Sequence, residues 1–218
     1  MNSKTHPLRN GNGLPMERLQ RLIVGISGAS GITYAVLTLE LLRLLDVETH
    51  LIISQGGDRT RAAETELSAE QVRSLADVSY NFRDIGAAIA SGSFRTDGII
   101  VVPCSMHTLS EIAHANASNL LTRAADVCLK ERRRLVLMTP ETPLHIGHLR
   151  NMLAVTEAGA IVMPPAPAFY LKPRTIDEIV HHTVARMLDL FGLDAALARW
   201  GEGTHDTNIE QQSSETKA

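Results

Sequence analysis

The chain has 218 residues, of which 44% are hydrophobic and 21% charged, so it is long enough to bury the core of one globular domain. Its formal net charge of −3 gives no basic field for nucleic acid. The uncharged apolar runs are shorter than a membrane span requires, and the N-terminus lacks the pattern of a signal peptide. We therefore expect a cytoplasmic protein without nucleic-acid or membrane partners.

Apolar β-rich runs alternate with amphipathic stretches along the body of the chain. Residues 1–19 and 201–218 are polar and non-periodic, so they are predicted to be mobile tails around one domain at 20–200. Predicted strands cover 22–27, 49–54, 98–103, 135–139 and 160–163, and predicted helices cover 31–45, 68–76, 107–114, 119–132, 145–158 and 175–192.

Strand-like runs such as 98–102 and 135–138 are apolar throughout, which is typical of parallel strands covered on both faces. The predicted fold class is therefore α/β, a doubly wound, Rossmann-like or flavodoxin-like sheet that is mainly parallel. Ligands of such sheets bind beyond the carboxyl ends of the strands. We expect the loops that start at Gly28, Ser54, Cys104 and Pro140 to converge there.

Three glycines, Gly25, Gly28 and Gly31, end the first strand and lead directly into a helix. Such a turn offers helix-start amides to an anion, which predicts phosphate binding, although glycine-rich turns also occur for packing alone. The spacing matches neither the dinucleotide fingerprint nor the Walker A pattern, so a different phosphate ligand is expected.

Several segments occur in the order and spacing of one family. They are 28–31, 64–66, 91–94, 103–109, 122–127, 129–132, 141–145 and 164–170. Through them the chain resembles the UbiX/Pad-type flavin prenyltransferases from about Leu22 to about Trp200. That family is similar to a wider flavin-binding group that includes the flavin-dependent cysteine decarboxylases.

The resemblance implies that reduced FMN is alkylated at N5 and C6 by dimethylallyl monophosphate, without a metal. The product would be the prenylated flavin used by UbiD-type decarboxylases. A homo-oligomer, expected to be a dodecamer with its active site between subunits, is implied as well.

The resemblance also assigns roles to individual residues. Catalytic roles fall on Ser30, Glu64 and Glu141, with Ser30 near flavin N5, Glu64 near the prenyl pocket and Glu141 managing a proton on the leaving phosphate. FMN-binding positions are Gly28, Ala29, Ser30, Ser54, Ser105, Met106, His107, Thr108 and Pro140. Donor-phosphate positions are Arg123, Lys130, Glu141, Tyr170 and Arg186.

Residues in these groups could also have a purely structural role instead of the assigned one. Ser105 could simply cap the helix that follows, and Lys130 could belong to a solvated helix end. The pair His145-x-x-His148 has no third candidate metal ligand, and Cys104 is expected to pack as a small apolar group.

The chain departs from the family pattern at Pro140, where an arginine is usual, at Gln55, where a lysine is common, and at Arg134, where a proline is usual. These departures concern activity and leave the fold prediction intact. Two alternative functions therefore stay open, a cysteine-type decarboxylase and a non-catalytic flavin-binding subunit of a decarboxylase.

Overall fold

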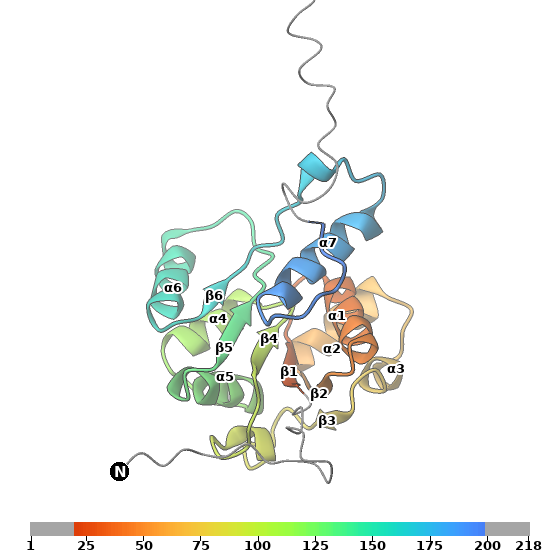
Figure 1. Cartoon of the computed structure of the whole chain (residues 1–218). Helices are drawn as coiled ribbons and strands as arrows, with labels where there is room; N and C mark the ends of the chain where they lie inside the picture. Colours follow the sequence, from red (N-terminus) through yellow and green to blue (C-terminus); the bar gives the residue numbers. More distant parts are fainter. Residues whose placement is uncertain (1–19, 199–218) are drawn as a thin grey trace, which may run out of the picture.

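Six parallel strands form the centre of the molecule, in the order β3-β2-β1-β4-β5-β6 (Figure 1). A computed structural model describes residues 20–198. The strands are β1 (Arg21–Ile26), β2 (Glu48–Ile53), β3 (Val78–Tyr80), β4 (Gly98–Val101), β5 (Arg134–Leu137) and β6 (Ile161–Val162). This order is that of a doubly wound dinucleotide-binding sheet, so the predicted fold class is confirmed.

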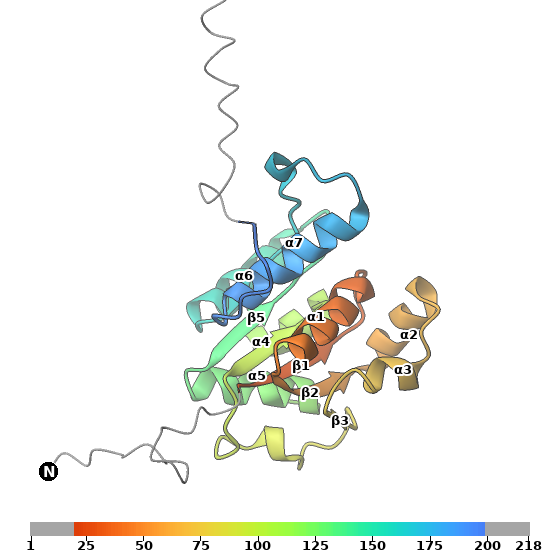
Figure 2. The ribbon, with the colours of Figure 1, turned by 45° about the vertical axis from the view of Figure 1, so that its right-hand side comes forward.

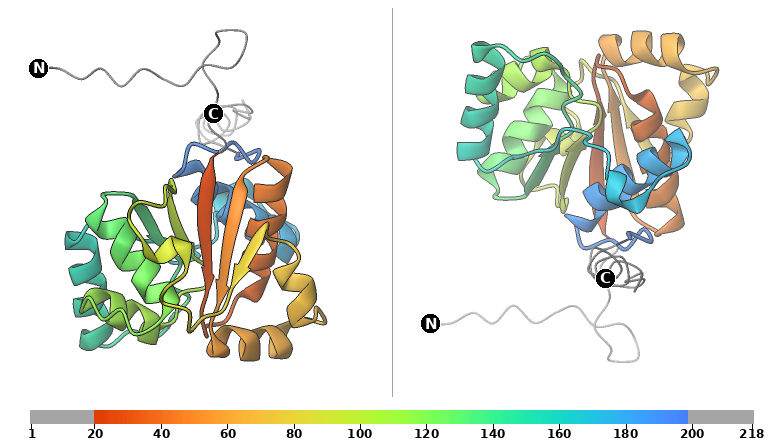
Figure 3. Two further views of the ribbon diagram at one scale, coloured as in Figure 1. Left: turned by 90° about the horizontal axis from the view of Figure 1, so that it is seen from below. Right: turned by 90° about the horizontal axis from the view of Figure 1, so that it is seen from above.

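Helices cover both faces of the sheet. They are α1 (Ile32–Leu44), α2 (Gln55–Glu64), α3 (Ala69–Arg73), α4 (Met106–Ala113), α5 (Leu120–Lys130), α6 (Ile146–Glu157) and α7 (Ile176–Asp189), with 3-10 turns η1 (Ala88–Ala90) and η2 (Phe169–Leu171). Figure 2 shows α7 beside α1, and Figure 3 shows α4, α5 and α6 together across the sheet from them.

The side chains of each strand alternate between two buried cores because successive residues of a strand point to opposite faces. Along β1, Leu22, Val24 and Ile26 pack in the core under α1 and α7. Ile23 packs in the core under α4, α5 and α6. A strand buried on both faces has no polar side, which explains why these runs are apolar throughout.

Two elements near the site escaped the sequence-based assignment. Strand β3 has only three residues, too few to show an alternating pattern. Helix α2 begins Gln-Gly-Gly-Asp, a weak helix-forming sequence, and it starts because Ser54 caps it. The helix predicted at 68–76 is confirmed in the shorter form α3.

The tails predicted at 1–19 and 201–218 lie outside the described residues. Between residues 20 and 198, none of the helices combines the length and the apolar character needed to cross a bilayer.

Candidate functional site

The strand order reverses between β1 and β4, since β2 and β3 follow on one side of β1 while β5 and β6 lie beyond β4. Ligands of open α/β sheets bind at such a switch point, outside the carboxyl ends of the strands. A cavity of about 640 Å³ opens there. Its lining residues are Gly28, Ser54, Gln55, Gly56, Phe82, Arg83, Ser105, His107, Thr108, Glu111, Ser118 and Asn119.

Glycines bring two of the cavity loops into direct backbone contact. A Cβ on Gly28 would lie 2.9 Å from Cα of Gly56, and a Cβ on Gly57 would lie 2.7 Å from the carbonyl oxygen of Ile26. Real Cβ atoms do not approach backbone atoms so closely, so these positions require glycine. The start of α2 can therefore pack against the loop after β1.

Two serine caps and a shared serine hold the loops in place. The Ser54 hydroxyl accepts a hydrogen bond from the Gly57 amide at 3.0 Å, and the Ser105 hydroxyl accepts one from the Thr108 amide at 3.3 Å. The amide of Ser105 donates to the Ser27 hydroxyl at 2.7 Å, which ties the loop after β4 to the loop after β1. The capping role considered for Ser105 is therefore present, and its side chain also lines the cavity.

The glycine-rich turn before α1 holds an internal carboxylate. Oε2 of Glu64, the last residue of α2, accepts hydrogen bonds from the Gly31 and Ile32 amides, both at 2.9 Å, and the Ser30 hydroxyl also bonds this carboxylate. In this structure Glu64 therefore takes up these two amides, and phosphate binding at the turn stays a prediction.

Opposing effects set the acidity of Glu64. Burial raises the pKa of its carboxyl, but the hydrogen bonds from Ile32, Ser30 and Gly31 outweigh burial and hold the pKa below the ordinary value. The carboxylate form is thus the one that this turn stabilises.

The cavity carries few charges. Arg83 is the single Lys or Arg among its described lining residues. Glu111, whose side chain is 14% exposed, accepts hydrogen bonds from Ser118 and Asn119. His107 is 83% exposed and its Nδ1 lies 3.7 Å from the Glu111 carboxylate.

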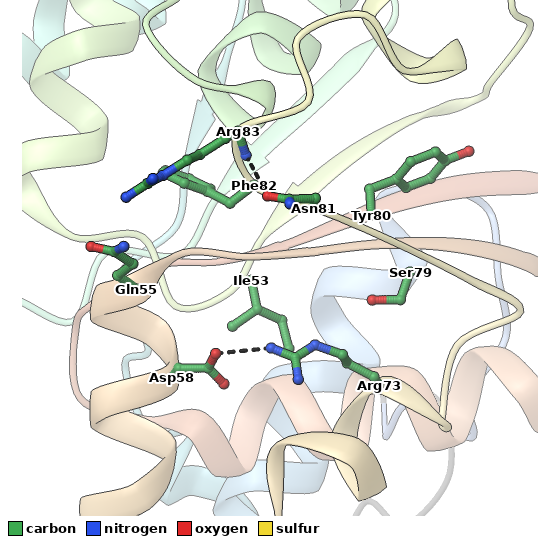
Figure 4. A pocket seen from close by; sticks show the side chains of 9 residues that line it. All are labelled: Ile53, Gln55, Asp58, Arg73, Ser79, Tyr80, Asn81, Phe82 and Arg83. Atoms are coloured by element: carbon green, nitrogen blue, oxygen red, sulfur yellow. Dashed lines mark hydrogen bonds and ion pairs between the residues drawn. The ribbon is translucent and has the colours of Figure 1, made fainter.

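A second cavity of about 460 Å³ adjoins the first and shares Gln55, Phe82 and Arg83 with it. Figure 4 shows Asp58 and Arg73 paired on one side of it and Arg83 extending toward Gln55 on the other. Of the two arginines that line this cavity, Arg73 is therefore paired with a carboxylate, whereas Arg83 reaches toward the start of α2.

The five predicted donor-phosphate residues do not meet in one chain. None of them lines the switch-point cavity, and Glu141 and Tyr170 are exposed. Lys130 pairs with Glu131 at 2.9 Å just before β5, whereas Glu141 follows β5 at its other end. With about 3.3 Å per residue, the four residues of this strand hold Lys130 and Glu141 more than about 10 Å apart.

Of the remaining three residues, Arg123 lies on α5, the helix that ends at Lys130, Tyr170 lies in η2 and Arg186 lies on α7. Arg123 pairs with Asp126 at 2.8 Å, and Arg186 pairs with Asp189 at 2.8 Å. The Tyr170 ring packs edge-on against His182, one helical turn before Arg186.

Of the predicted FMN-binding residues, the cavity brings together Gly28, Ser54, Ser105, His107 and Thr108. Ala29, Ser30, Met106 and Pro140 lie outside its lining. Sequence reasoning missed seven lining residues, namely Gln55, Gly56, Phe82, Arg83, Glu111, Ser118 and Asn119. Recognition of β3 would have indicated Phe82 and Arg83, because they follow its carboxyl end.

The cysteines and the histidine pair carry no reactive arrangement. Both thiols are unpaired and buried, and burial raises the pKa of Cys104 and raises that of Cys128 to about 12. His145 Nδ1 accepts from the Gly147 amide as a helix cap, with its ring 3.7 Å from that of His148. Within residues 20–198 no three His, Cys, Asp or Glu side chains gather as a metal site would require.

The fold and the cavity define an α/β protein that binds its ligand at a topological switch point. The sequence matches the Flavoprotein family over residues 13–188. It is 56% identical over 188 residues to the flavin prenyltransferase UbiX of Neisseria meningitidis, covering 86% of this chain and all of the relative. Identity to UbiX of Escherichia coli K12 is 53% over 186 residues, covering 84% of this chain and 98% of the relative.

Solved structures agree. AnUbiX in complex with FMN and dimethylallyl pyrophosphate superposes with a TM-score of 0.84 at 49% identity, covering 86% of this chain and 100% of the other. A dodecameric FMN-dependent UbiX-like decarboxylase from Escherichia coli O157:H7 gives a TM-score of 0.82 at 52% identity, covering 84% and 100%. The chain belongs to the UbiX flavin prenyltransferases within the Flavoprotein family, which confirms the predicted resemblance.

Proposed function

We propose that the protein is a flavin prenyltransferase that moves a dimethylallyl group from dimethylallyl monophosphate to reduced FMN. The observation that carries this proposal is the switch-point cavity, lined by Gly28, Ser54 and Ser105, in a chain more than half identical to UbiX. In the reaction the allylic carbon–oxygen bond breaks, inorganic phosphate leaves, and that carbon bonds to flavin N5. The prenyl double bond then takes up one proton at its carbon nearer N5, and its other carbon bonds to C6. The N5 and C6 protons are lost, so the two steps together release one proton.

The cavity suits a flavin phosphate ester and its ribityl chain. Ser54, Ser105 and Thr108 provide hydroxyl groups, and the starts of α2 and α4 provide amides. We place Ala29, Ser30 and Met106 beside the same ligand, beyond the cavity lining, because they are continuous with lining residues. Pro140 is assigned to the margin of this site.

Ser30 and Glu64 form the proton-handling pair of this proposal. The Ser30 hydroxyl is hydrogen-bonded to the Glu64 carboxylate, whose pKa is held low. An ionised carboxylate beside a hydroxyl can take up the proton that alkylation releases from the flavin. This arrangement supports the roles assigned to both residues.

The donor-phosphate site is proposed to form between subunits. Lys130 and Glu141 lie at opposite ends of β5, so one chain cannot direct both at one phosphate. Arg123 bonds the Ala90 carbonyl from α5, whereas Tyr170 packs on α7, one helical turn before Arg186. We infer a homo-oligomer, a dodecamer by analogy with the E. coli O157:H7 protein, in which neighbouring copies complete the set.

Within that shared site the charges have distinct tasks. Lys130 and Arg186 would neutralise the departing phosphate, with Arg123 nearby, and Tyr170 would hydrogen-bond it. Glu141 would deliver or hold a proton on the phosphate. The reaction needs no metal in this proposal.

The product is proposed to pass to a UbiD-type decarboxylase. We place the reaction in the cytoplasm, which the two unpaired buried thiols support. The alternative of a cysteine-type decarboxylase has weaker support, since the FMN-dependent cysteine decarboxylase TvaF is 16% identical with a TM-score of 0.55, a likeness of fold alone.

Mass spectrometry of the flavin tests the reaction. After anaerobic incubation of the protein with reduced FMN and dimethylallyl monophosphate, a gain of one prenyl unit is expected. FMN that stays bound but unchanged would instead support the non-catalytic flavin-binding subunit.

Complementation tests the shared site. Lys130→Ala and Glu141→Gln should each be inactive alone, and co-assembled oligomers should recover activity because some interfaces contain neither change. Light scattering should show an oligomer. A fully active monomer would refute the shared site.

A further inference from the structure

We infer that Arg83 is the residue that makes this protein prefer FMN over riboflavin, by binding the flavin phosphate. The inference rests on the proposed use of a flavin. It adds a phosphate-binding residue that the motif-based assignment did not contain, at the junction of the two adjoining cavities.

The first support is the scarcity of positive charge. A phosphate monoester carries a charge of about −1.5 to −2 at neutral pH. Among the described residues that line the switch-point cavity, Arg83 is the single Lys or Arg. The family lysine after Ser54 is Gln55 here, so the loop that caps α2 supplies no side-chain cation.

The second support is that the Arg83 guanidinium is available to a ligand. Arg83 is exposed, and within the described residues its hydrogen bonds come from the backbone alone: its amide donates to the Asn81 side chain at 3.0 Å and its carbonyl accepts from the Ile85 amide at 3.0 Å. Asp58, the acidic residue that lines the second cavity together with Arg83, is already paired with Arg73 at 2.9 Å and Arg61 at 3.4 Å. Arg83 is therefore not neutralised by that carboxylate.

The third support is the direction of the side chain. In Figure 4 Arg83 extends past Phe82 toward Gln55, the first residue of α2. Gln55 and Arg83 both line each of the two cavities. The guanidinium thus adds its charge to the positive end of the α2 dipole.

The negative charge in the cavity favours the same division of the ligand. The Glu111 carboxylate, which accepts hydrogen bonds from Ser118 and Asn119, would repel a phosphate. Ribityl hydroxyls, which can donate to a carboxylate, suit Glu111, and the phosphate suits Arg83.

Calorimetric titration of the flavin-free oligomer with FMN and with riboflavin tests the inference. Arg83→Gln should weaken FMN binding about ten- to hundred-fold, as expected for losing a charge-assisted contact, and leave riboflavin binding unchanged. Arg83→Lys should retain part of the preference. Arg59→Gln removes the same charge from α2 without touching either cavity, so both affinities should stay at wild-type values.

Each other result overturns the inference. Equal losses for FMN and riboflavin would mean that Arg83 only supports the loop, and unchanged FMN affinity would mean that another group holds the phosphate. If the wild-type protein bound neither flavin, the proposed function would fail together with this inference. Wild-type FMN binding that Arg83→Gln leaves intact would refute this inference alone.

Discussion

The capping of α1 by Glu64 yields a stability prediction with a defined pH dependence. Glu64→Ala removes an acceptor that bonds two helix-start amides at 2.9 Å and also the Ser30 hydroxyl. Because the side chain is largely exposed, we reduce the value for charge-assisted bonds to that of an ordinary N-terminal cap, about 1 to 2 kcal/mol. Glu64→Gln keeps an amide oxygen for the amides and should cost about half as much, through the lost charge at the helix dipole.

The sign of the pH dependence follows from the lowered pKa. A carboxyl whose folded pKa lies below its unfolded value stabilises the fold above the unfolded pKa, and this contribution is lost as pH falls through the folded pKa. The ordinary value for Glu64 is 4.5, so the difference between wild type and Glu64→Gln should be full at neutral pH and disappear below the folded pKa, on the acid side of that value.

Urea unfolding at fixed protein concentration, from pH 7 down into the acid range, measures this difference. Glu66→Gln provides the control, since Glu66 is an exposed neighbour for which no capping bond is found within the described chain. Equal stabilities of wild type and Glu64→Gln at pH 7 would refute the capping argument. A difference that persisted unchanged at acid pH would show that the carboxylate charge is irrelevant.

Three further predictions concern the cavity and the shared site. Gly57→Ala places a Cβ 2.7 Å from the Ile26 carbonyl oxygen and should cost about 1 to 3 kcal/mol in urea unfolding and weaken FMN binding, whereas Gly86→Ala, with its nearest atom at 3.5 Å, should be close to neutral. Equal effects of the two changes would contradict the close-packing explanation. Glu141→Gln should abolish prenyl transfer while calorimetry still detects FMN binding, because the amide cannot manage a proton on the leaving phosphate, and Tyr170→Phe should act more mildly. Wild-type turnover by Glu141→Gln would exclude the acid role. Pro140→Arg should tighten FMN or dimethylallyl monophosphate binding by about ten-fold or more in calorimetry, since arginine adds charge-assisted donors where proline has none. Unchanged affinity for both, with robust wild-type turnover, would show that another cation has replaced the family arginine.

Patterns of apolar residues along the sequence were sufficient to predict most of the fold. Runs such as residues 98–102 are apolar at every position because both faces of β4 are buried, so the strand and the parallel sheet could be predicted together. Strand β3 could not be predicted in this way, because three residues are too few to show an alternating pattern of side chains. Its place in the sheet depends on pairing with β2.

Glu64 shows a contact at the site that local interpretation of the sequence missed. The glycine-rich turn has the residues of an anion site, and it does hold an anion, but that anion is a carboxylate 33 residues further along the chain. The end of α2 brings it there, and α2 itself has too weak a helical sequence to be predicted. The motif thus indicated that the amides of the turn bond an anion, but not that Glu64 is bonded to them in the folded chain.

By itself, the sequence determined the α/β class, the family, and the loops after β1, β2 and β4, because strand periodicity and motif spacing are properties of neighbouring residues. Only the tertiary structure decided which side chains share a space. It placed Arg83 in the cavity, put Lys130 and Glu141 at opposite ends of β5, and gave the amides before α1 to Glu64. The reason is physical: contacts between residues far apart in the chain are set by how the sheet and helices pack, and no local pattern records that packing.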